Sequence, residues 1–232
     1  MEDILREGIA ALGLSVTETQ LAAFRAYYTL LDARSRVMNL TAIHGETDTA
    51  RLHFLDCAAL LPMADFAGAS VIDVGTGAGF PGLPLRILEP DMHLTLLDSL
   101  AKRVDFLSEV CTELELTDVQ CLHARAEEAS DLRESFDVAT SRAVARLDLL
   151  SELCLPLVRV GGIFLAMKGP DCAEELEAAR HAIEILGGEP ELLTYTIPGT
   201  DTGRSVVRIR KVRETPDKYP RRWAKMQKSP II

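Results

Sequence analysis

Three closely spaced glycines and a distant carboxylate form a pattern that could hold a ligand. The short apolar run Val71–Val74 predicts a buried strand and leads directly into Gly75, Gly77 and Gly79. Glycines let the chain turn sharply and let a ligand lie against main-chain N–H groups. Asp98 ends a second apolar run, 23 residues after Gly75, and a carboxylate at about that distance is suited to accept both hydroxyls of a ribose. The spacing therefore predicts a site for a nucleoside-bearing cofactor.

The glycines also fit a dinucleotide fingerprint, because Gly77–Gly82 reads Gly-x-Gly-x-x-Gly. That match is weak by itself. Asp73 precedes the glycines inside the strand end, and Pro81 and Pro84 lie in the predicted opening turn of the next helix. A pyrophosphate needs free N–H groups at a helix N-terminus, and proline has none. A cofactor without phosphate, such as S-adenosylmethionine, has no such need, so we expect it here, with a NAD-linked oxidoreductase as an alternative.

Simpler structural explanations exist for the same residues. The glycines could form a tight strand-to-helix turn that binds nothing, and Asp98 could cap a helix that starts at Ser99. Three glycines together with Asp73 and the Asp98 spacing favour ligand binding over a bare turn. Asp98 could serve as both ribose acceptor and N-cap.

The elements that must position these residues alternate between strands and helices. Predicted strands are Val71–Val74, His93–Leu97, Val119–His123, Phe136–Thr140, Gly162–Met167, Glu191–Thr196 and Ser205–Arg210. Predicted helices between them are Pro81–Leu88, Ser99–Leu114, Leu147–Val158 and Cys172–Leu186. This alternation predicts an α/β fold with a mostly parallel sheet wrapped by helices. Ligands of such folds bind beyond the carboxyl ends of the strands, so one rim should gather Asp73–Gly79, Asp98, Ala126–Glu127, Ser141–Arg142 and Lys168.

Before the alternating region the sequence is helical. Residues 1–14 predict a short helix, Thr17–Gln20 has a capping-box pattern, and Thr47–Leu61 predicts a further helix. We therefore divide the chain into an N-terminal helical extension (1–68), an α/β core (69–212) and a basic C-terminal tail (213–232).

Composition limits the classes of protein that the chain can be. Its 232 residues are 47% hydrophobic, enough for one sizeable core, and its net charge is −10. No apolar run approaches the ~18 residues of a membrane span, and the acidic N-terminus lacks the features of a signal peptide. The five cysteines and five histidines show no metal-ligand spacing. We expect a cytoplasmic protein with reduced thiols, no membrane partner and no metal.

The charge is unevenly distributed. Residues 204–232 carry a net charge of +8, and the rest of the chain carries −18. A basic segment on an acidic body can dock a polyanion locally, because salt screens each charge beyond roughly 8 Å; it can equally be a solvated terminus. Its end combines cations with one aromatic ring, a mixture suited to phosphates and unpaired bases: Arg221, Arg222, Trp223, Lys225 and Lys228.

Nearly the whole chain resembles the bacterial small-subunit (16S) ribosomal RNA guanine-N7 methyltransferases, also known as glucose-inhibited division protein B. The resemblance is carried by Asp73–Leu85 with its Gly-Phe-Pro-Gly extension and by Leu96–Val104. Shorter matches are Asn39–Ile43, His53-x-x-Asp56, Ser141–Ala143, Lys168-Gly169 and Tyr219–Arg221. It implies a class I S-adenosylmethionine-dependent methyltransferase fold (Rossmann-like, with a seven-stranded mostly parallel sheet and helices on both faces). It also implies methylation of one guanine N7 near the decoding centre of small-subunit ribosomal RNA, with that RNA or the small ribosomal subunit as partner.

The resemblance also assigns residues. By motif match it implies cofactor contacts at Gly75, Phe80, Ala126, Glu127 and Arg142, with Asp98 at the ribose. From the glycine pattern itself we also expect Asp73, Gly77 and Gly79 to belong to the cofactor site. Arg142 and Lys168 would position the reactants, and RNA contacts would come from Asn39, His53, Arg221, Arg222 and Lys225. His53 could instead be a helix-packing residue, and Asn39 could cap a turn. The chain departs from the family pattern at Cys57, where serine is usual, and at Arg222–Met226, where Gly-x-Pro is usual.

Guanine N7 carries no proton, so its methylation needs no general base. Alignment of N7, methyl and sulfur would supply the catalysis, helped by groups that tolerate charge moving to the purine. Alternatives are a class I methyltransferase acting on another RNA, a protein or a small molecule, and a non-catalytic module that keeps the cofactor pocket.

Overall fold

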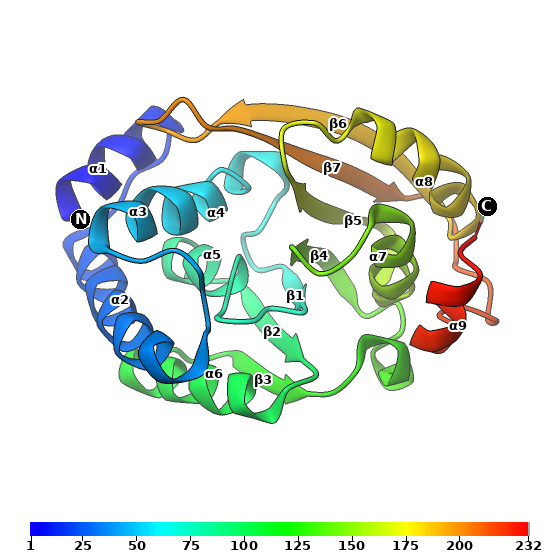
Figure 1. The fold of residues 1–232 in the computed structure, drawn as a ribbon, viewed down its shortest axis with the longest axis horizontal. Helices are drawn as coiled ribbons and strands as arrows, with labels where there is room; N and C mark the ends of the chain where they lie inside the picture. The colour runs from blue at the N-terminus through cyan, green and yellow to red at the C-terminus, as the bar shows by residue number, and fades with distance from the viewer. Residues whose placement is uncertain (232) are drawn as a thin grey trace.

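The computed structural model of the chain describes residues 1–231, in which one seven-stranded sheet runs through the molecule (Figure 1). The strand order is β3-β2-β1-β4-β5-β7-β6. The first five of these strands are parallel, and β7 is antiparallel to both of its neighbours. The strands are β1 (Ser70–Val74), β2 (His93–Asp98), β3 (Val119–His123), β4 (Phe136–Arg142), β5 (Val158–Lys168), β6 (Gly188–Thr196) and β7 (Gly203–Lys211). The predicted mostly parallel α/β sheet is confirmed, and each predicted strand lies within an observed one.

Helices pack on both faces of the sheet. The α-helices are α1 (Glu2–Ala11), α2 (Glu18–Met38), α3 (Glu46–Thr49), α4 (Asp56–Ala58), α5 (Gly82–Leu88), α6 (Ala101–Glu113), α7 (Leu147–Cys154), α8 (Ala173–Ile185) and α9 (Trp223–Lys228). Shorter helical turns are η1 (Ala50–Leu55), η2 (Leu61–Met63), η3 (Ala126–Glu128), η4 (Ser130–Leu132) and η5 (Leu155–Leu157). Figure 1 shows α1 and α2 at one end of the molecule and α8 and α9 at the other.

Two hydrophobic clusters lie on the two faces, because alternate side chains of a strand point to opposite sides. In β1, Val71 joins the cluster that contains Phe24 and Phe54 of the N-terminal helices. Its neighbour Ile72 joins the cluster that contains Leu150 of α7. Burial on both faces explains why the parallel strands are almost continuously apolar.

The N-terminal helices are joined to the sheet by buried contacts. The capping box is confirmed, since the Thr17 side chain accepts from the Gln20 N–H and the Gln20 side chain accepts from the Thr17 N–H. The predicted helix Thr47–Leu61 is observed as α3, the π-helical turn η1 and α4, and it ends earlier than predicted, at Ala58. From α2, the buried Tyr27 hydroxyl donates to the Ala78 carbonyl in the glycine turn. The N-terminal helices therefore support the turn that the sequence marks as a ligand site.

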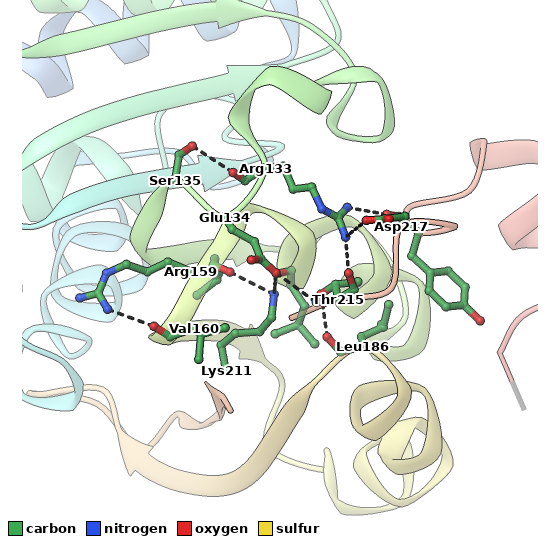
Figure 2. Close-up of polar contacts among 12 residues, drawn as sticks. Arg133, Glu134, Ser135, Arg159, Val160, Leu186, Lys211, Thr215 and Asp217 are labelled. Atoms are coloured by element: carbon green, nitrogen blue, oxygen red, sulfur yellow. Dashed lines mark hydrogen bonds and ion pairs between the residues drawn. The ribbon is translucent and has the colours of Figure 1, made fainter. Parts of the chain in front are cut away.

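The C-terminal tail packs on the core. Figure 2 shows its anchoring contacts: the Lys211 ammonium donates to the Glu134 carboxylate, and the Thr215 N–H donates to that same carboxylate. The Arg133 guanidinium donates to the carbonyls of Thr215 and Tyr219. Further along the tail, the second hydrophobic cluster includes Tyr219 and Met226, and Trp223 and Ile231 pack against it.

Among the helices described, none combines the length and apolar character needed to cross a bilayer. Within residues 1–231, no three His, Cys, Asp or Glu side chains gather as metal ligands would.

Candidate active site

The side chain of Asp73 forms hydrogen bonds that fix the glycine turn between β1 and α5. One oxygen of this buried carboxylate, Oδ2, accepts from the Thr76 hydroxyl at 2.6 Å and from the Gly82 N–H at 2.9 Å. The Leu83 N–H donates to the Gly79 carbonyl at 2.8 Å. With prolines at 81 and 84, the first turn of α5 has no N–H group left for a phosphate. This arrangement disfavours a dinucleotide and fits a cofactor without a pyrophosphate.

Asp73 itself is in an unusual electrostatic environment. Burial raises the pKa of its carboxyl to about 6, although its hydrogen bonds and Arg142 act in the opposite direction. Its second oxygen, Oδ1, has no hydrogen-bond partner. Asp73 therefore contacts the loop and not the cavity surface, so any effect on a cofactor passes through the shape of the glycine turn.

Asp98 is also buried, with 2% of its surface exposed. Its carboxylate accepts from the N–H groups of Gly77 (3.0 Å) and Leu100 (2.9 Å) and from Arg103 (3.3 Å). The prediction that Asp98 caps the next helix is wrong, because α6 starts at Ala101 after Leu100 and has no side-chain cap. The carboxylate instead fixes the glycine turn against the end of β2.

A cavity of about 200 Å³ opens above this turn. It is bounded by five parts of the chain: the glycine turn, the end of β2, the segment after β3, the loop and helix after β4, and the C-terminal helix. The lining residues are Val74, Gly75, Leu97, Ser99, Ala124, Arg125, Ala126, Glu127, Val144, Leu153 and Trp223. We call this the first cavity. It brings together Gly75, Ala126 and Glu127 as predicted.

The first cavity suits the nucleoside end of S-adenosylmethionine by its chemistry. Most of its surface is apolar, Glu127 offers a carboxylate, and the Arg125 guanidinium lies 3.7 Å from that carboxylate. Its volume is below the about 300–1,000 Å³ of sites that enclose a whole drug-sized ligand, so it would hold a ring system and not a dinucleotide. Gly75 has a φ of +70°, and a Cβ there would lie 2.5 Å from Val144 Cγ2, so this wall has no room for a side chain.

A second cavity, of about 390 Å³, also borders the loop that follows β4. Its walls come from the N-terminal helices and from the ends of β4, β5 and β7. The lining residues are Ile43, Leu52, His53, Asp56, Arg142, Ala143, Met167, Lys168, Gly169 and Arg204. Three of them are cations and one is a buried carboxylate. Since Arg142 and Ala143 line the second cavity and Val144 lines the first, the two cavities share one short loop.

Arg142 is the centre of a polar network in the second cavity. Its guanidinium donates to Asp56 at 3.2 Å and to His53 Nδ1 at 2.8 Å, and it lies 4.8 Å from the centroid of the Phe80 ring. Asp56 also accepts from the Tyr195 hydroxyl at 2.8 Å and lies 3.6 Å from the Arg204 guanidinium. The protein therefore holds Arg142 in one orientation, and its charge is neutralised by Asp56.

His53 is a neutral packing residue in this network. Burial, and then the Arg142 charge, lower the pKa of its imidazole to about 3. Arginine only donates, so His53 Nδ1 accepts and Nε2 carries the proton that is donated to Thr41 Oγ1 at 2.7 Å. The ring stacks on Phe80 at 4.2 Å between centroids. With both nitrogens engaged, His53 is unsuited to act as a base.

Lys168 braces the loop between the cavities. Its ammonium donates to the Ala145 carbonyl and to Glu175, both at 2.9 Å. Glu175 in turn accepts from the Leu147 N–H at 2.7 Å. Lys168 thus lines the second cavity while fixing the loop, which fits the positioning role predicted for it.

The predicted RNA-binding residues are dispersed over the structure. Asn39 follows α2 as its C-cap residue, with a φ of 50°. This is the geometry of a turn, which was the alternative to RNA contact. The Arg221 guanidinium is bound to the buried Glu152 at 2.5 and 2.7 Å. Arg222 and Lys225 are exposed. Only His53 of this group lies beside the second cavity, and there it is 6% exposed.

Sequence reasoning missed the residues that complete the two cavities through distant contacts. Tyr195, Arg204 and Trp223 come from the C-terminal third of the chain, and no local pattern links them to the rim motifs. Asp56 was visible only as part of the His53-x-x-Asp56 motif.

A family model and curated relatives match most of this chain. The family model described as GidB, rRNA small subunit methyltransferase G, matches residues 20–200. A Ribosomal RNA small subunit methyltransferase G of Lachnoclostridium phytofermentans is 46% identical over 97% of this chain and 96% of its own. A protein of the same name from Acetivibrio thermocellus is 44% identical over 100% of this chain and 97% of its own.

Solved structures show the same fold at low sequence identity. A SAM-dependent methyltransferase from Aquifex aeolicus has a TM-score of 0.53 at 16% identity and covers 71% of this chain and 93% of its own. TYW2 of M. jannaschii, solved in complex with AdoMet, has a TM-score of 0.55 at 12% identity and covers 74% of this chain and 80% of its own. The fold is that of the S-adenosylmethionine-dependent methyltransferases, as expected. With relatives that match it almost from end to end, the chain belongs to the rRNA small subunit methyltransferase G family.

Proposed function

We propose that this protein transfers a methyl group from S-adenosylmethionine to the N7 of a guanine in small-subunit ribosomal RNA, near the decoding centre. Family membership supports the donor and the class of substrate. The observation that carries the proposal within the chain is the pair of cavities that share the loop Arg142–Val144. One cavity fits a nucleoside without phosphates, and the other is lined by cations.

The first cavity would hold the cofactor. Gly75 and Ala126 provide close walls, Glu127 provides a carboxylate for polar groups, and Asp98 fixes the glycine turn from behind. Asp98 would contact the ribose. To do so, its carboxylate would exchange one of its present hydrogen-bond donors for a ribose hydroxyl. When bound, S-adenosylmethionine supplies an electrophilic methyl group on a sulfonium.

The second cavity would receive the guanine. Arg142 and Arg204 give it a positive rim suited to the phosphates and carbonyl oxygen of a nucleotide, while Asp56 balances the charge inside. Because guanine N7 carries no proton, the side chains need only to orient the base. Arg142 and Lys168 do this indirectly, by holding the loop between the two cavities in one position.

The substrate in the cell would be the small subunit or its RNA, and the site of action the cytoplasm, where ribosomes assemble. The division into a helical extension (1–68), a core (69–212) and a tail (213–232) fits this proposal, because the second cavity combines side chains of the extension and the core.

The test is methyl transfer in vitro. The purified chain is incubated with S-adenosylmethionine labelled on its methyl group and with small subunits from cells that lack this modification. We expect label in the RNA, and we expect S-adenosylhomocysteine, but not NADH, to raise the melting temperature. Absence of label in RNA, or label in a ribosomal protein, would contradict the proposed substrate. Stabilisation by NADH alone would contradict the proposed cofactor.

A further inference from the structure

The C-terminal helix contributes one side chain to the first cavity. Trp223, the first residue of α9, lines it together with Gly75, Ala126 and Glu127. It is the single tryptophan of the chain, and it is the one aromatic ring among the described residues that line this cavity.

Trp223 is held in place by its neighbours in the tail. Two residues before it, Arg221 binds the buried Glu152 of α7 through its backbone N–H at 2.8 Å and through its guanidinium. Three residues after it, Met226 is fully buried in the second hydrophobic cluster, and the Trp223 ring packs against the same cluster.

The anchoring continues upstream in the tail (Figure 2). Tyr219 is 7% exposed, and its carbonyl accepts from Arg133 at 2.8 Å. Thr215 donates its hydroxyl to the Leu186 carbonyl at 2.7 Å. The tail thus crosses the core with fixed contacts before it reaches the first cavity, so the indole is presented by an ordered segment.

We infer that Trp223 stacks on the adenine ring of the methyl donor, which makes the C-terminal tail part of the cofactor site. The inference rests on the proposed function, because that function places the nucleoside in the first cavity. A flat indole and a flat purine attract through their faces, and such stacking on a base contributes about 1–3 kcal/mol by alanine substitution, which corresponds to roughly 5- to 150-fold in affinity. The alternative role, stacking of Trp223 on an unpaired RNA base, requires the ring to leave a cavity that it now lines.

The lone tryptophan provides the first test without any mutation. With excitation at 295 nm, emission of the wild-type chain reports on position 223 alone. We expect S-adenosylhomocysteine to change this emission along a saturating curve, with the same dissociation constant as calorimetry gives. Saturable heat without any change in emission would overturn the inference.

Substitution provides the second test. Trp223→Ala should weaken S-adenosylhomocysteine binding by about tenfold, within the range expected for one stacked base, and Trp223→Phe should restore most of the affinity because it keeps a ring. Gln227→Ala, on an exposed position of the same helix, is the matched control and should bind as wild type does. Equal affinity of Trp223→Ala and wild type would overturn the inference, as would equal losses in Trp223→Phe and Trp223→Ala.

Binding measurements distinguish failure of the proposed function from failure of the proposed role of Trp223. If the wild-type chain binds no S-adenosylhomocysteine by calorimetry, the proposed function fails. If it binds but Trp223→Ala binds equally well and loses only methylation of the RNA, the proposed function stands, and Trp223 belongs to the RNA interface.

Discussion

Arg142 lines the second cavity and begins the short loop that the two cavities share. Its guanidinium binds Asp56 and His53, and the following residue, Ala143, has a φ of +58°. A left-handed backbone costs a non-glycine residue about 1–2 kcal/mol, so the contacts of Arg142 hold the loop in a conformation that it would not choose alone. In the proposed function, Arg142 would therefore act by positioning this loop, with its charge balanced by Asp56.

Removal of the Arg142 side chain should destabilise the fold. Arg142→Ala leaves Asp56 buried without its closest cation, and breaking a buried ion pair costs about 3–5 kcal/mol. Because Tyr195 and Arg204 remain beside Asp56, we expect a loss of about 3 kcal/mol in the free energy of unfolding, measured with urea. Arg142→Lys keeps the charge and should lose about 1 kcal/mol, from missing hydrogen bonds. Wild-type stability of Arg142→Ala would show that the network contributes nothing.

Asp73 predicts a particular dependence of stability on pH. Its pKa is about 6 when folded and about 3.9 when unfolded. Between these values the unfolded chain has lost the proton and the folded chain keeps it, so stability falls as pH rises from about 4 to about 6. Asp73→Asn keeps an acceptor for Thr76 and Gly82 and cannot ionise. Relative to wild type, this variant should gain on the order of 2–3 kcal/mol across that interval, measured by urea unfolding at each pH. A constant difference between the two proteins from pH 4 to 7 would refute the raised pKa.

At the scale of elements, the turn between β1 and α5 depends on a glycine with a close neighbour. Gly75 and Gly13 both have positive φ, +70° and +75°, but a Cβ at Gly75 would meet Val144, whereas a Cβ at Gly13 would meet nothing within 4 Å. Alanine substitutions at Gly13 and Gly75 therefore distinguish two effects on the free energy of unfolding. Gly13→Ala adds backbone strain alone, whereas Gly75→Ala adds strain and a steric clash at the first cavity.

We expect Gly13→Ala to lower stability by about 1 kcal/mol through strain alone and to bind S-adenosylhomocysteine as wild type does. Gly75→Ala should lower stability by more and should also weaken binding at least tenfold, because Val144 is displaced into the first cavity. Calorimetry and urea unfolding measure the two effects. Equal binding by both variants would mean that the cofactor site is elsewhere.

Much of the element order followed from the sequence, because each strand has its own apolar run and each is bounded by a turn. Val119–His123 was predicted with its observed bounds, and β1 and β2 each differed by one residue. The site was predicted less completely. The Arg221–Glu152 pair and the Trp223 contact with the first cavity join segments that are far apart in the chain. Only tertiary packing creates such contacts, so the charge of the tail left two interpretations open, a segment that docks a polyanion and a solvated terminus.

Across the whole molecule, the basic C-terminal region is partly neutralised by the acidic body. Half of the ten cations in residues 204–232 form ion pairs, namely Arg204, Arg208, Arg210, Lys211 and Arg221. Within residues 1–231, Lys225 and Lys228 of α9 form no ion pair and are exposed. Arg222, directly before Trp223, is likewise exposed, so α9 and its N-cap residue present three cations near the first cavity.

Charge reversal on α9 should therefore lower the rate of RNA methylation without changing the affinity for the cofactor. Lys225→Glu with Lys228→Glu should lower the rate on small subunits several-fold, with a smaller difference at high salt because salt screens exposed charges. Affinity for S-adenosylhomocysteine should not change. Deletion of residues 213–232 is a poor substitute, because it would expose the surface under Tyr219 and Met226 and leave Glu152 unpaired. An unchanged rate of the double variant at low salt would remove α9 from the RNA interface.

The identity of the methylated nucleoside tests the proposed activity of the whole molecule most directly. Small subunits that lack the modification are incubated with the chain and S-adenosylmethionine, and their RNA is digested and analysed by mass spectrometry against authentic standards. We expect 7-methylguanosine from one position of the small-subunit RNA. A methyl group on another atom or another base, or no methylated nucleoside at all, would contradict it.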